Sequence, residues 1–370
     1  MSEPSPGRSR RIPELDGLRG VAILLVLCWH VAPSLVAGRP PAVQRLVSSL
    51  IRYTWSGVDL FFVLSGFLLG GILLDHRGSS RYFKTFYLRR FYRIMPLYYV
   101  MVALFVVLRL VRRPSTLDWL FVPPMPLVAY LAFLQNFAMA RADTTGAQWL
   151  GPTWSLAVEE QFYLVLPILI RTIPRRLLSH ASALMVVAAI SLRAAMYLWG
   201  RHGASSAYML MPARADALML GVLAALAVRD PRTRAFCERR RGVLYGTVLG
   251  LSLGVLGMAL RHELVGSPGM ILFGYTLIAL LYTTVLVLAV TVRQDEMVGR
   301  LLRSRPLRST GVLAYGLYLI HLPVIGLTSL VFGAQSVVGA VALVATFLLA
   351  SISWRYFEEP LVRRGHHHQY

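Results

Sequence analysis

The chain has 370 residues, of which 56% are hydrophobic and only 15% are charged. Soluble domains carry nearer a quarter charged residues, so this composition excludes an ordinary soluble enzyme. The formal net charge of +21 comes almost entirely from arginine, because Lys84 is the single lysine. Such a charge favours a membrane protein with basic cytoplasmic loops. Nucleic-acid binding is not expected, since no basic stretch outside the hydrophobic segments is interleaved with aromatic residues.

Apolar residues gather in continuous runs, each close to the ~20 residues that a helix needs to cross a bilayer. Eleven such segments fill the chain, near residues 18–36, 55–74, 94–111, 119–138, 153–170, 180–199, 206–228, 243–260, 270–292, 309–332 and 336–356. In lipid the backbone must satisfy its own hydrogen bonds, which predicts an all-α, polytopic transmembrane helical bundle. No segment remains for a soluble catalytic domain, so any chemistry must take place within the bundle.

Arginine clusters separate several of these segments, and one follows the last of them. They lie at residues 77–93, 171–176, 229–241, 293–308 and 363–364. If all the clusters are cytoplasmic, both termini are cytoplasmic and the number of crossings is even. We therefore expect about ten spans plus one possible re-entrant segment. The segment 119–138, which three prolines interrupt, is favoured for this role over 94–111, which has arginines at both ends.

The same pattern divides the chain into three parts. Residues 1–17 form a cytoplasmic N-terminal tail, 18–360 the transmembrane domain and 361–370 a cytoplasmic C-terminal tail. No small-residue cleavage site follows the first apolar run, so the N-terminal part is interpreted as a tail and not as a signal peptide. The histidines at 366–368 could bind a metal, but a loosely held tail is favoured and no metal site is predicted.

The first span carries two ionisable residues, Arg19 and His30. At ~100° and ~1.5 Å per residue, they lie within about 20° of one helix face and roughly 16 Å apart along the axis. A histidine can act as a general base or proton shuttle at neutral pH. A structural histidine bonded to a neighbouring helix and an arginine held by lipid headgroups are the alternatives, and the residues alone leave both open.

A second polar group stands at the start of the segment 153–170. Ser155, Glu159 and Tyr163 follow an i, i+4, i+8 pattern and therefore share one helix face. A carboxylate there could orient an imidazole, as in a catalytic dyad or triad. Alternatively, Glu159 and Glu160 are simply favoured by the positive end of the helix dipole.

A third candidate is the pair Arg90 and Arg93, which lie three residues apart and so are neighbours on a helical turn. Paired guanidiniums bind phosphate groups well, although the excess of arginine in cytoplasmic loops would also explain them. Other ionisable residues inside spans are functional candidates, because charge is costly in lipid. They are Asp59, Arg214, Asp216 and His321.

Taken in order, these blocks resemble the acyltransferase 3 family of membrane acyltransferases over nearly the whole chain. They are residues 15–20, the arginine-ten-residues-histidine pair of Arg19 and His30, residues 57–67, Arg90-x-x-Arg93, and residues 154–163, 214–218, 315–321 and 357–360. Any one block is a weak signal, and their combination in this order is specific.

The resemblance implies transfer of an acyl group, by default acetyl, from cytoplasmic acyl-CoA to a hydroxyl of a sugar, glycan or glycosylated metabolite. It implies acyl-CoA as co-substrate, no metal, a carbohydrate partner and a multi-pass location in the bacterial cytoplasmic membrane. Some members carry a further extracytoplasmic hydrolase-like domain. The chain ends at Tyr370 without one, and we therefore do not expect a two-domain relay acting on peptidoglycan.

The resemblance also suggests roles. Arg90 and Arg93, with Arg19, are predicted to hold the phosphates of acyl-CoA. His30, Glu159 and Arg19 are the predicted catalytic residues, with His30 as general base and Glu159 or another carboxylate orienting it. The predicted substrate-binding residues are Asp59, Ser155, Tyr163, Arg214, Asp216 and His321. The alternative is a transporter or flippase for a glycolipid or related amphiphile, which polar residues within spans would also suit.

Overall fold

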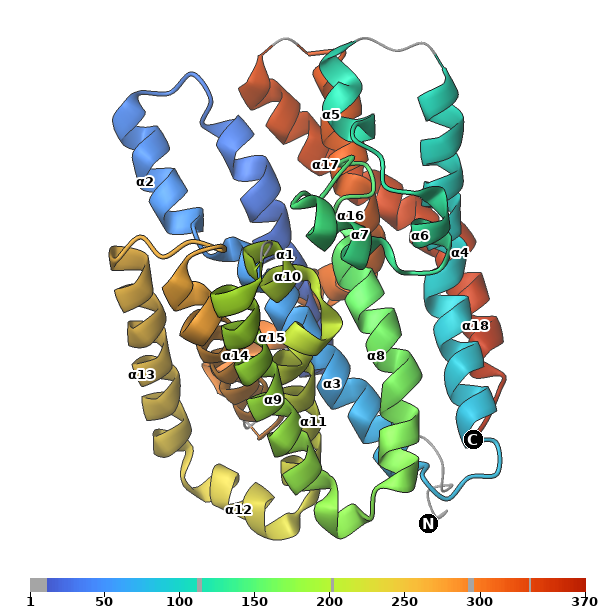
Figure 1. Ribbon diagram of the computed structural model, residues 1–370, viewed down its shortest axis with the longest axis vertical. Helices are drawn as coiled ribbons and strands as arrows, with labels where there is room; N and C mark the ends of the chain where they lie inside the picture. Colours follow the sequence, from blue (N-terminus) through green and yellow to red (C-terminus); the bar gives the residue numbers. More distant parts are fainter. Residues whose placement is uncertain (1–11, 112–114, 201–202, 292–295, 333) are drawn as a thin grey trace.

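The computed structural model describes residues 12–111, 115–200, 203–291, 296–332 and 334–370, and this part of the chain contains helices and connections but no strand (Figure 1). The apolar runs form its long helices. These are α1 (Pro13–Leu35), α3 (Gly57–Asp75), α4 (Tyr82–Leu110), α8 (Thr153–Thr172), α9 (Leu178–Trp199), α11 (Met211–Arg229), α13 (Arg241–Leu260), α14 (Tyr275–Thr291), α16 (Arg305–Ser329) and α17 (Gln335–Ser353).

Shorter helices connect or extend these. They are α2 (Pro41–Ile51), α5 (Asp118–Phe121), α6 (Leu127–Leu131), α7 (Gln135–Ala142), α10 (Gly203–Met209), α12 (Pro231–Arg239), α15 (Met297–Leu302) and α18 (Glu359–His366). A π-helical turn joins α17 to α18, so that the last span continues as one long, bent helix.

Nine stretches of the described chain are long and apolar enough to cross a membrane, and they take in every long helix except α8. α8 has 20 residues, and the run Glu159-Glu160-Gln161 near its start makes it less apolar than the rest. It nevertheless runs alongside the other long helices (Figure 1). The chain is therefore an all-α, multi-pass membrane protein, as its hydrophobic pattern predicts.

The segment 119–138 is the one predicted span that does not form a long helix. It breaks into α5, α6 and the start of α7, none of which is long enough to cross a bilayer. Proline supplies no backbone N–H and ends a helix, so Pro123, Pro124 and Pro126 account for the interruption. The competing segment 94–111 belongs to the continuous helix α4.

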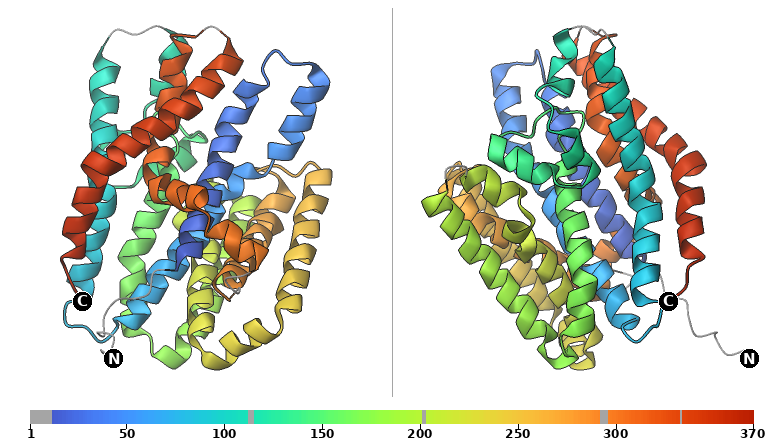
Figure 2. Two further views of the ribbon diagram at one scale, coloured as in Figure 1. Left: turned by 180° about the vertical axis from the view of Figure 1, so that it is seen from behind. Right: turned by 45° about the vertical axis from the view of Figure 1, so that its right-hand side comes forward.

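One end of the bundle collects the basic connections. The turns after α3 and α8 and the short helix α12 lie at the lower end of Figure 1, and α18 ends in the same half (Figures 1 and 2). These segments contain the arginine clusters at 171–176, 229–241 and 363–364 and the beginning of the one at 77–93, which the sequence predicts to be cytoplasmic. We refer to this as the basic end of the bundle.

Two close helix crossings fix the centre of the bundle. A methyl group added to Gly20 of α1 would collide with a backbone carbonyl of α16, and one added to Gly66 of α3 with a backbone carbonyl of α11. Small residues of this kind let membrane helices approach until their backbones touch. The neighbours of these glycines, Arg19 and Ser65, are thereby held on rigid helices that face the interior.

The C-terminal segment differs from the loosely held tail that the sequence suggests. α18 packs against α4, the Arg89 Nε atom donates a hydrogen bond to the His368 carbonyl at 2.9 Å, and Thr85 Oγ1 donates one to the Gln369 carbonyl at 2.9 Å. These bonds tie residues 368 and 369 to the start of α4. The sequence of the tail does not reveal these contacts, because a run of histidines has the same composition whether or not it packs against a neighbouring helix.

Candidate active site

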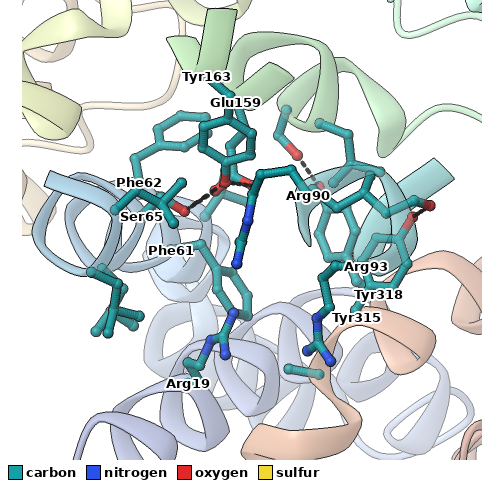
Figure 3. A pocket seen from close by; sticks show the side chains of 18 of the residues that line it. Arg19, Phe61, Phe62, Ser65, Arg90, Arg93, Glu159, Tyr163, Tyr315 and Tyr318 are labelled. Carbon is teal, nitrogen blue, oxygen red and sulfur yellow. Dashed lines mark hydrogen bonds between the residues drawn. The ribbon is translucent and has the colours of Figure 1, made fainter. Parts of the chain in front are cut away.

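A cavity of about 250 Å³ opens among α1, α3, α4, α8 and α16 (Figure 3). Its lining extends to Ile72, near the end of α3 that leads into the basic end. Its charged lining residues are Arg19 from α1, Arg90 and Arg93 from α4, and Glu159 from α8. We call it the basic cavity. Its remaining walls are mainly apolar and aromatic, with Phe61 among them.

The three arginines of the basic cavity have an unusual environment. Within the described chain, none of Arg19, Arg90 and Arg93 makes a side-chain hydrogen bond or ion pair, and Arg93 only lies over the Trp354 ring at 5.1 Å. Three cations thus share the cavity with one carboxylate. Placing partly buried arginines in a membrane protein without counter-charges costs free energy. Guanidinium groups form strong hydrogen bonds with phosphates and carboxylates. The arrangement is therefore fitted to an anionic ligand.

The carboxylate of Glu159 binds two hydroxyl groups on the cavity wall. Ser65 Oγ donates to one oxygen at 2.6 Å, and the Tyr163 hydroxyl donates to the other at 2.8 Å (Figure 3). Ser155 lines the same cavity, so the helix face predicted from its spacing with Glu159 and Tyr163 is confirmed. Both oxygens of Glu159 are occupied by these hydroxyls.

A second cavity, also about 250 Å³, is lined by Val58 at the start of α3 and His30 in the later part of α1, so it lies farther from the basic end. We call it the aromatic cavity, because its wall contains three tryptophans and two tyrosines; they are Trp29, Trp55, Trp154, Tyr208 and Tyr318. His30 lines it, together with Thr145 and Gln148 from the segment before α8, which lies in the upper half of Figure 1. It combines apolar rings, hydrogen-bonding groups and one imidazole.

Val58 and Tyr318 line both cavities and form a partition between them. The Tyr318 hydroxyl donates to the Pro152 carbonyl at 2.9 Å and lies 2.6 Å from Ser155 Oγ. Pro152 belongs to the wall of the aromatic cavity and Ser155 to that of the basic cavity. The tyrosine is therefore anchored to both walls, and Val58 and Tyr318 are the residues that the two linings share.

The structure separates residues that the sequence places in one site. Arg19 lines the basic cavity and His30 the aromatic cavity, although both belong to α1. The expectation that Glu159 orients His30 is not met, since Glu159 binds Ser65 and Tyr163. The Nδ1 atom of His30 instead lies 2.9 Å from the Val26 carbonyl and 3.3 Å from Nε2 of His321.

Four charged residues form a separate buried cluster. Arg214 is ion-paired with Asp59, and Arg193 with Asp216 at 2.9 Å. Thr276 donates a further hydrogen bond to Asp216 at 2.7 Å. All four charged side chains are at most 1% exposed, and none lines the basic or the aromatic cavity. This geometry suits a neutral structural network that joins α3, α9, α11 and α14.

Some residues of these sites were not singled out by sequence reasoning. Arg193 is an ionisable residue in the middle of an apolar span, and this alone should have marked it. Ser65 and Tyr318 lie in the sequence blocks 57–67 and 315–321, which also contain the candidates Asp59 and His321. The tryptophans of the aromatic cavity come from three distant segments, so their spacing carries no signal.

Comparison with known proteins assigns the chain to a family. A family described as "Acyltransferase domain" matches residues 12–355, nearly the whole chain. The chain belongs to the acyltransferase 3 family. The resemblance that its sequence blocks indicate is thereby confirmed.

The chain is also similar to individual bacterial proteins. It is 27% identical over 374 residues to "Peptidoglycan O-acetyltransferase OatA" of Listeria monocytogenes, covering 96% of this chain and 56% of the relative. It is 25% identical over 377 residues to "O-acetyltransferase OatA" of Staphylococcus aureus, covering 96% of this chain and 58% of the relative. The chain thus spans a little over half the length of these relatives. No solved structure matches it.

Proposed function

We propose that this protein is a membrane O-acetyltransferase that takes an acetyl group from acetyl-CoA and transfers it to a hydroxyl of a glycan. Membership of the acyltransferase family supports group transfer, and the relatives' names support acetyl as the group. Because the chain matches only part of those relatives, similarity alone does not assign their activity to it. The two cavities provide independent support for the proposal.

The basic cavity is the proposed donor site. Coenzyme A carries a pyrophosphate and a 3′-phosphate, and the unpaired guanidiniums of Arg19, Arg90 and Arg93 offer the charge-assisted hydrogen bonds that phosphates require. The pantetheine arm would extend along the apolar wall from the arginines toward the partition. The basic end faces the cytoplasm under the positive-inside rule, which is also the compartment that holds acyl-CoA.

The aromatic cavity is the proposed acceptor site. Aromatic rings present flat apolar faces against which a sugar ring can stack, and Thr145 and Gln148 can bind its hydroxyls. One relative is named for peptidoglycan, a glycan outside the cytoplasmic membrane. The cavity lies toward the end opposite the basic connections, so a glycan would enter from the extracytoplasmic side. A bacterial cytoplasmic membrane location follows from this assignment.

His30 is the proposed general base. The acceptor oxygen attacks the carbonyl carbon of the thioester and gives its proton to Nε2 of His30. The bond between carbon and sulfur then breaks, so the acetyl group becomes an ester of the acceptor, and the CoA thiolate takes the proton from His30. The reaction needs no further reactant. His30 is the imidazole that lines the aromatic cavity, and this observation carries the proposal.

A transferase assay with purified protein tests this function. The protein in detergent is supplied with radiolabelled acetyl-CoA and a panel of glycan oligomers, and acetylated product is measured. We expect transfer by the wild type and loss of at least about 100-fold in kcat for His30→Ala, in line with the usual contribution of a general base. His180→Ala removes an exposed histidine of α9 and serves as the matched control. Undiminished transfer by His30→Ala would exclude His30 from the mechanism.

The transporter alternative gains no support from the relatives, which are named as acetyltransferases. A transporter has no need of a coenzyme site. Thermal stabilisation by CoA therefore separates the two functions, because a ligand specific to the folded state raises its apparent stability. A rise in the melting temperature with CoA supports the transferase, and no shift at saturating CoA supports the transporter.

A further inference from the structure

A second histidine lies directly behind His30. His321 of α16 is fully buried, and its ring centroid lies 4.8 Å from that of His30, with the two planes inclined by 56°. Its Nε2 atom is 3.3 Å from Nδ1 of His30. His30 lines the aromatic cavity, whereas His321 lines neither that cavity nor the basic one. The geometry thus places His321 in contact with His30 and outside both cavities.

The backbone carbonyls around the pair decide where its protons lie, because a carbonyl oxygen only accepts hydrogen bonds. Nδ1 of His321 is 2.7 Å from the Tyr318 carbonyl, so in the neutral ring Nδ1 carries the proton and Nε2 holds a lone pair. Nδ1 of His30 is 2.9 Å from the Val26 carbonyl, so it too carries its proton. That N–H also faces the lone pair on Nε2 of His321.

This arrangement leaves one nitrogen available for chemistry. With Nδ1 of His30 protonated and shared between the Val26 carbonyl and His321, the lone pair of His30 is on Nε2. Nε2 is the atom that a general base at this position needs. When it takes a proton, the ring becomes a cation, and the lone pair of His321 then faces its positively charged Nδ1–H group.

We infer that His321 is a positioning residue that fixes the tautomer of His30 and stabilises its protonated form during acyl transfer. This inference rests on the proposed function, in which His30 is the base. The role is the one that a buried carboxylate has in a catalytic triad, but here the partner is neutral. A neutral partner suits a site deep in the membrane, where a buried carboxylate would be costly.

Paired substitutions test the role of His321. In His321→Gln the side-chain oxygen can accept a hydrogen bond close to the former Nε2 position, whereas His321→Leu has similar bulk and no acceptor. We expect His321→Leu to lower kcat by about 10-fold to 100-fold, within the usual range for acid–base assistance, with little change in KM for either substrate. His321→Gln should recover most of the lost kcat. Stabilisation by CoA should be unchanged in both, which reports that the fold and the donor site are intact.

Two results would overturn the inference. Wild-type kcat in His321→Leu would show that the lone pair is not needed, and equal losses in the Leu and Gln variants would show that shape and not hydrogen bonding matters. If His30→Ala retains transfer, His30 is not the base and the inference falls with that assignment. If the wild type transfers no acetyl group to any glycan, the proposed function itself fails, so the two failures are distinguished.

A spectroscopic measurement decides the matter if His321→Leu does not fold. The ¹⁵N spectrum of histidine-labelled wild-type protein, assigned with His30→Ala and His321→Gln, reports which ring nitrogens are protonated. The inference predicts protonated Nδ1 and bare Nε2 in both rings. A proton on Nε2 of His30 in the resting protein would contradict it.

Discussion

The protein contains two groups of arginines in its hydrophobic interior, and they differ in one respect. Arg193 and Arg214 are each paired with an aspartate and sealed from solvent. Arg90 and Arg93 line a cavity and have no carboxylate partner within the described chain. Residue type alone does not separate these groups, since both are arginines in or beside apolar spans. The difference is whether the protein itself neutralises the charge or leaves it for a ligand.

The largest effect is expected from breaking the sealed cluster. Arg214→Ala leaves Asp59 buried without its partner, which costs about 3–5 kcal/mol in comparable buried pairs. We expect a sharp fall in the yield of folded protein and in its melting temperature. The double variant Asp59→Asn with Arg214→Gln removes both charges and should regain part of this stability. A melting temperature unchanged by Arg214→Ala would contradict a structural role.

A smaller effect, and one of a different kind, is expected in the basic cavity. Arg90→Ala removes a charge-assisted contact worth about 1.5–3 kcal/mol, which corresponds to a rise of roughly 10-fold to 100-fold in Kd for CoA. Stability without ligand should hardly change, because no intramolecular pair is lost. The matched control is Arg175→Ala, which removes an exposed arginine between α8 and α9. If both variants weaken CoA binding equally, the loss reflects the overall positive charge of the protein and not a specific contact made by Arg90.

The partition should limit the size of the acyl group that reaches the aromatic cavity. Val58→Ala shortens one of the two side chains shared by the cavities. A difference of a methylene group in an apolar pocket changes selectivity by about 10-fold or more. We therefore expect the ratio of kcat/KM for butyryl-CoA over acetyl-CoA to rise by about 10-fold. An unchanged ratio would mean that the acyl group does not pass this point.

The smallest effect is expected when one carboxylate is removed from each group of arginines, and the two substitutions should have different consequences. Glu159→Gln takes the single acidic residue from the lining of the basic cavity and should strengthen CoA binding by about 2-fold to 5-fold, since an opposing charge near the phosphates is lost. Asp216→Asn should instead lower the melting temperature, because Arg193 loses its counter-ion. Titration calorimetry measures the affinity for CoA, and thermal melts measure the stability of each variant. If both variants lose stability, Glu159 is also part of a structural ion network, and the two groups of arginines do not differ as proposed.

Much of the fold could be predicted from local sequence. Continuous apolar runs specify membrane helices without any knowledge of their neighbours, and prolines mark the segment 119–138 that fails to cross. The shared face of Ser155, Glu159 and Tyr163 also follows from helical spacing within one element. Each of these predictions depends only on residues that are close together in the chain.

The contacts between helices could not be predicted in this way. Arg214 and Asp216 share a helix, yet each pairs with a residue of another helix, because residues two apart point to different faces. The same limit applies to Glu159, whose position on α8 says nothing about which helix it faces. The rotation of each helix about its axis, which the close crossings at Gly20 and Gly66 help to fix, decides these partners.

In the proposed reaction, donor and acceptor reach the protein from opposite ends. Inverted membrane vesicles, with the cytoplasmic face outward, test it most directly. A glycan that is acetylated in detergent is trapped inside the vesicles, labelled acetyl-CoA is added outside, and His30→Ala vesicles serve as the control. We expect labelled glycan inside wild-type vesicles only. Product that forms only when glycan and acetyl-CoA are on the same side of the membrane would contradict it.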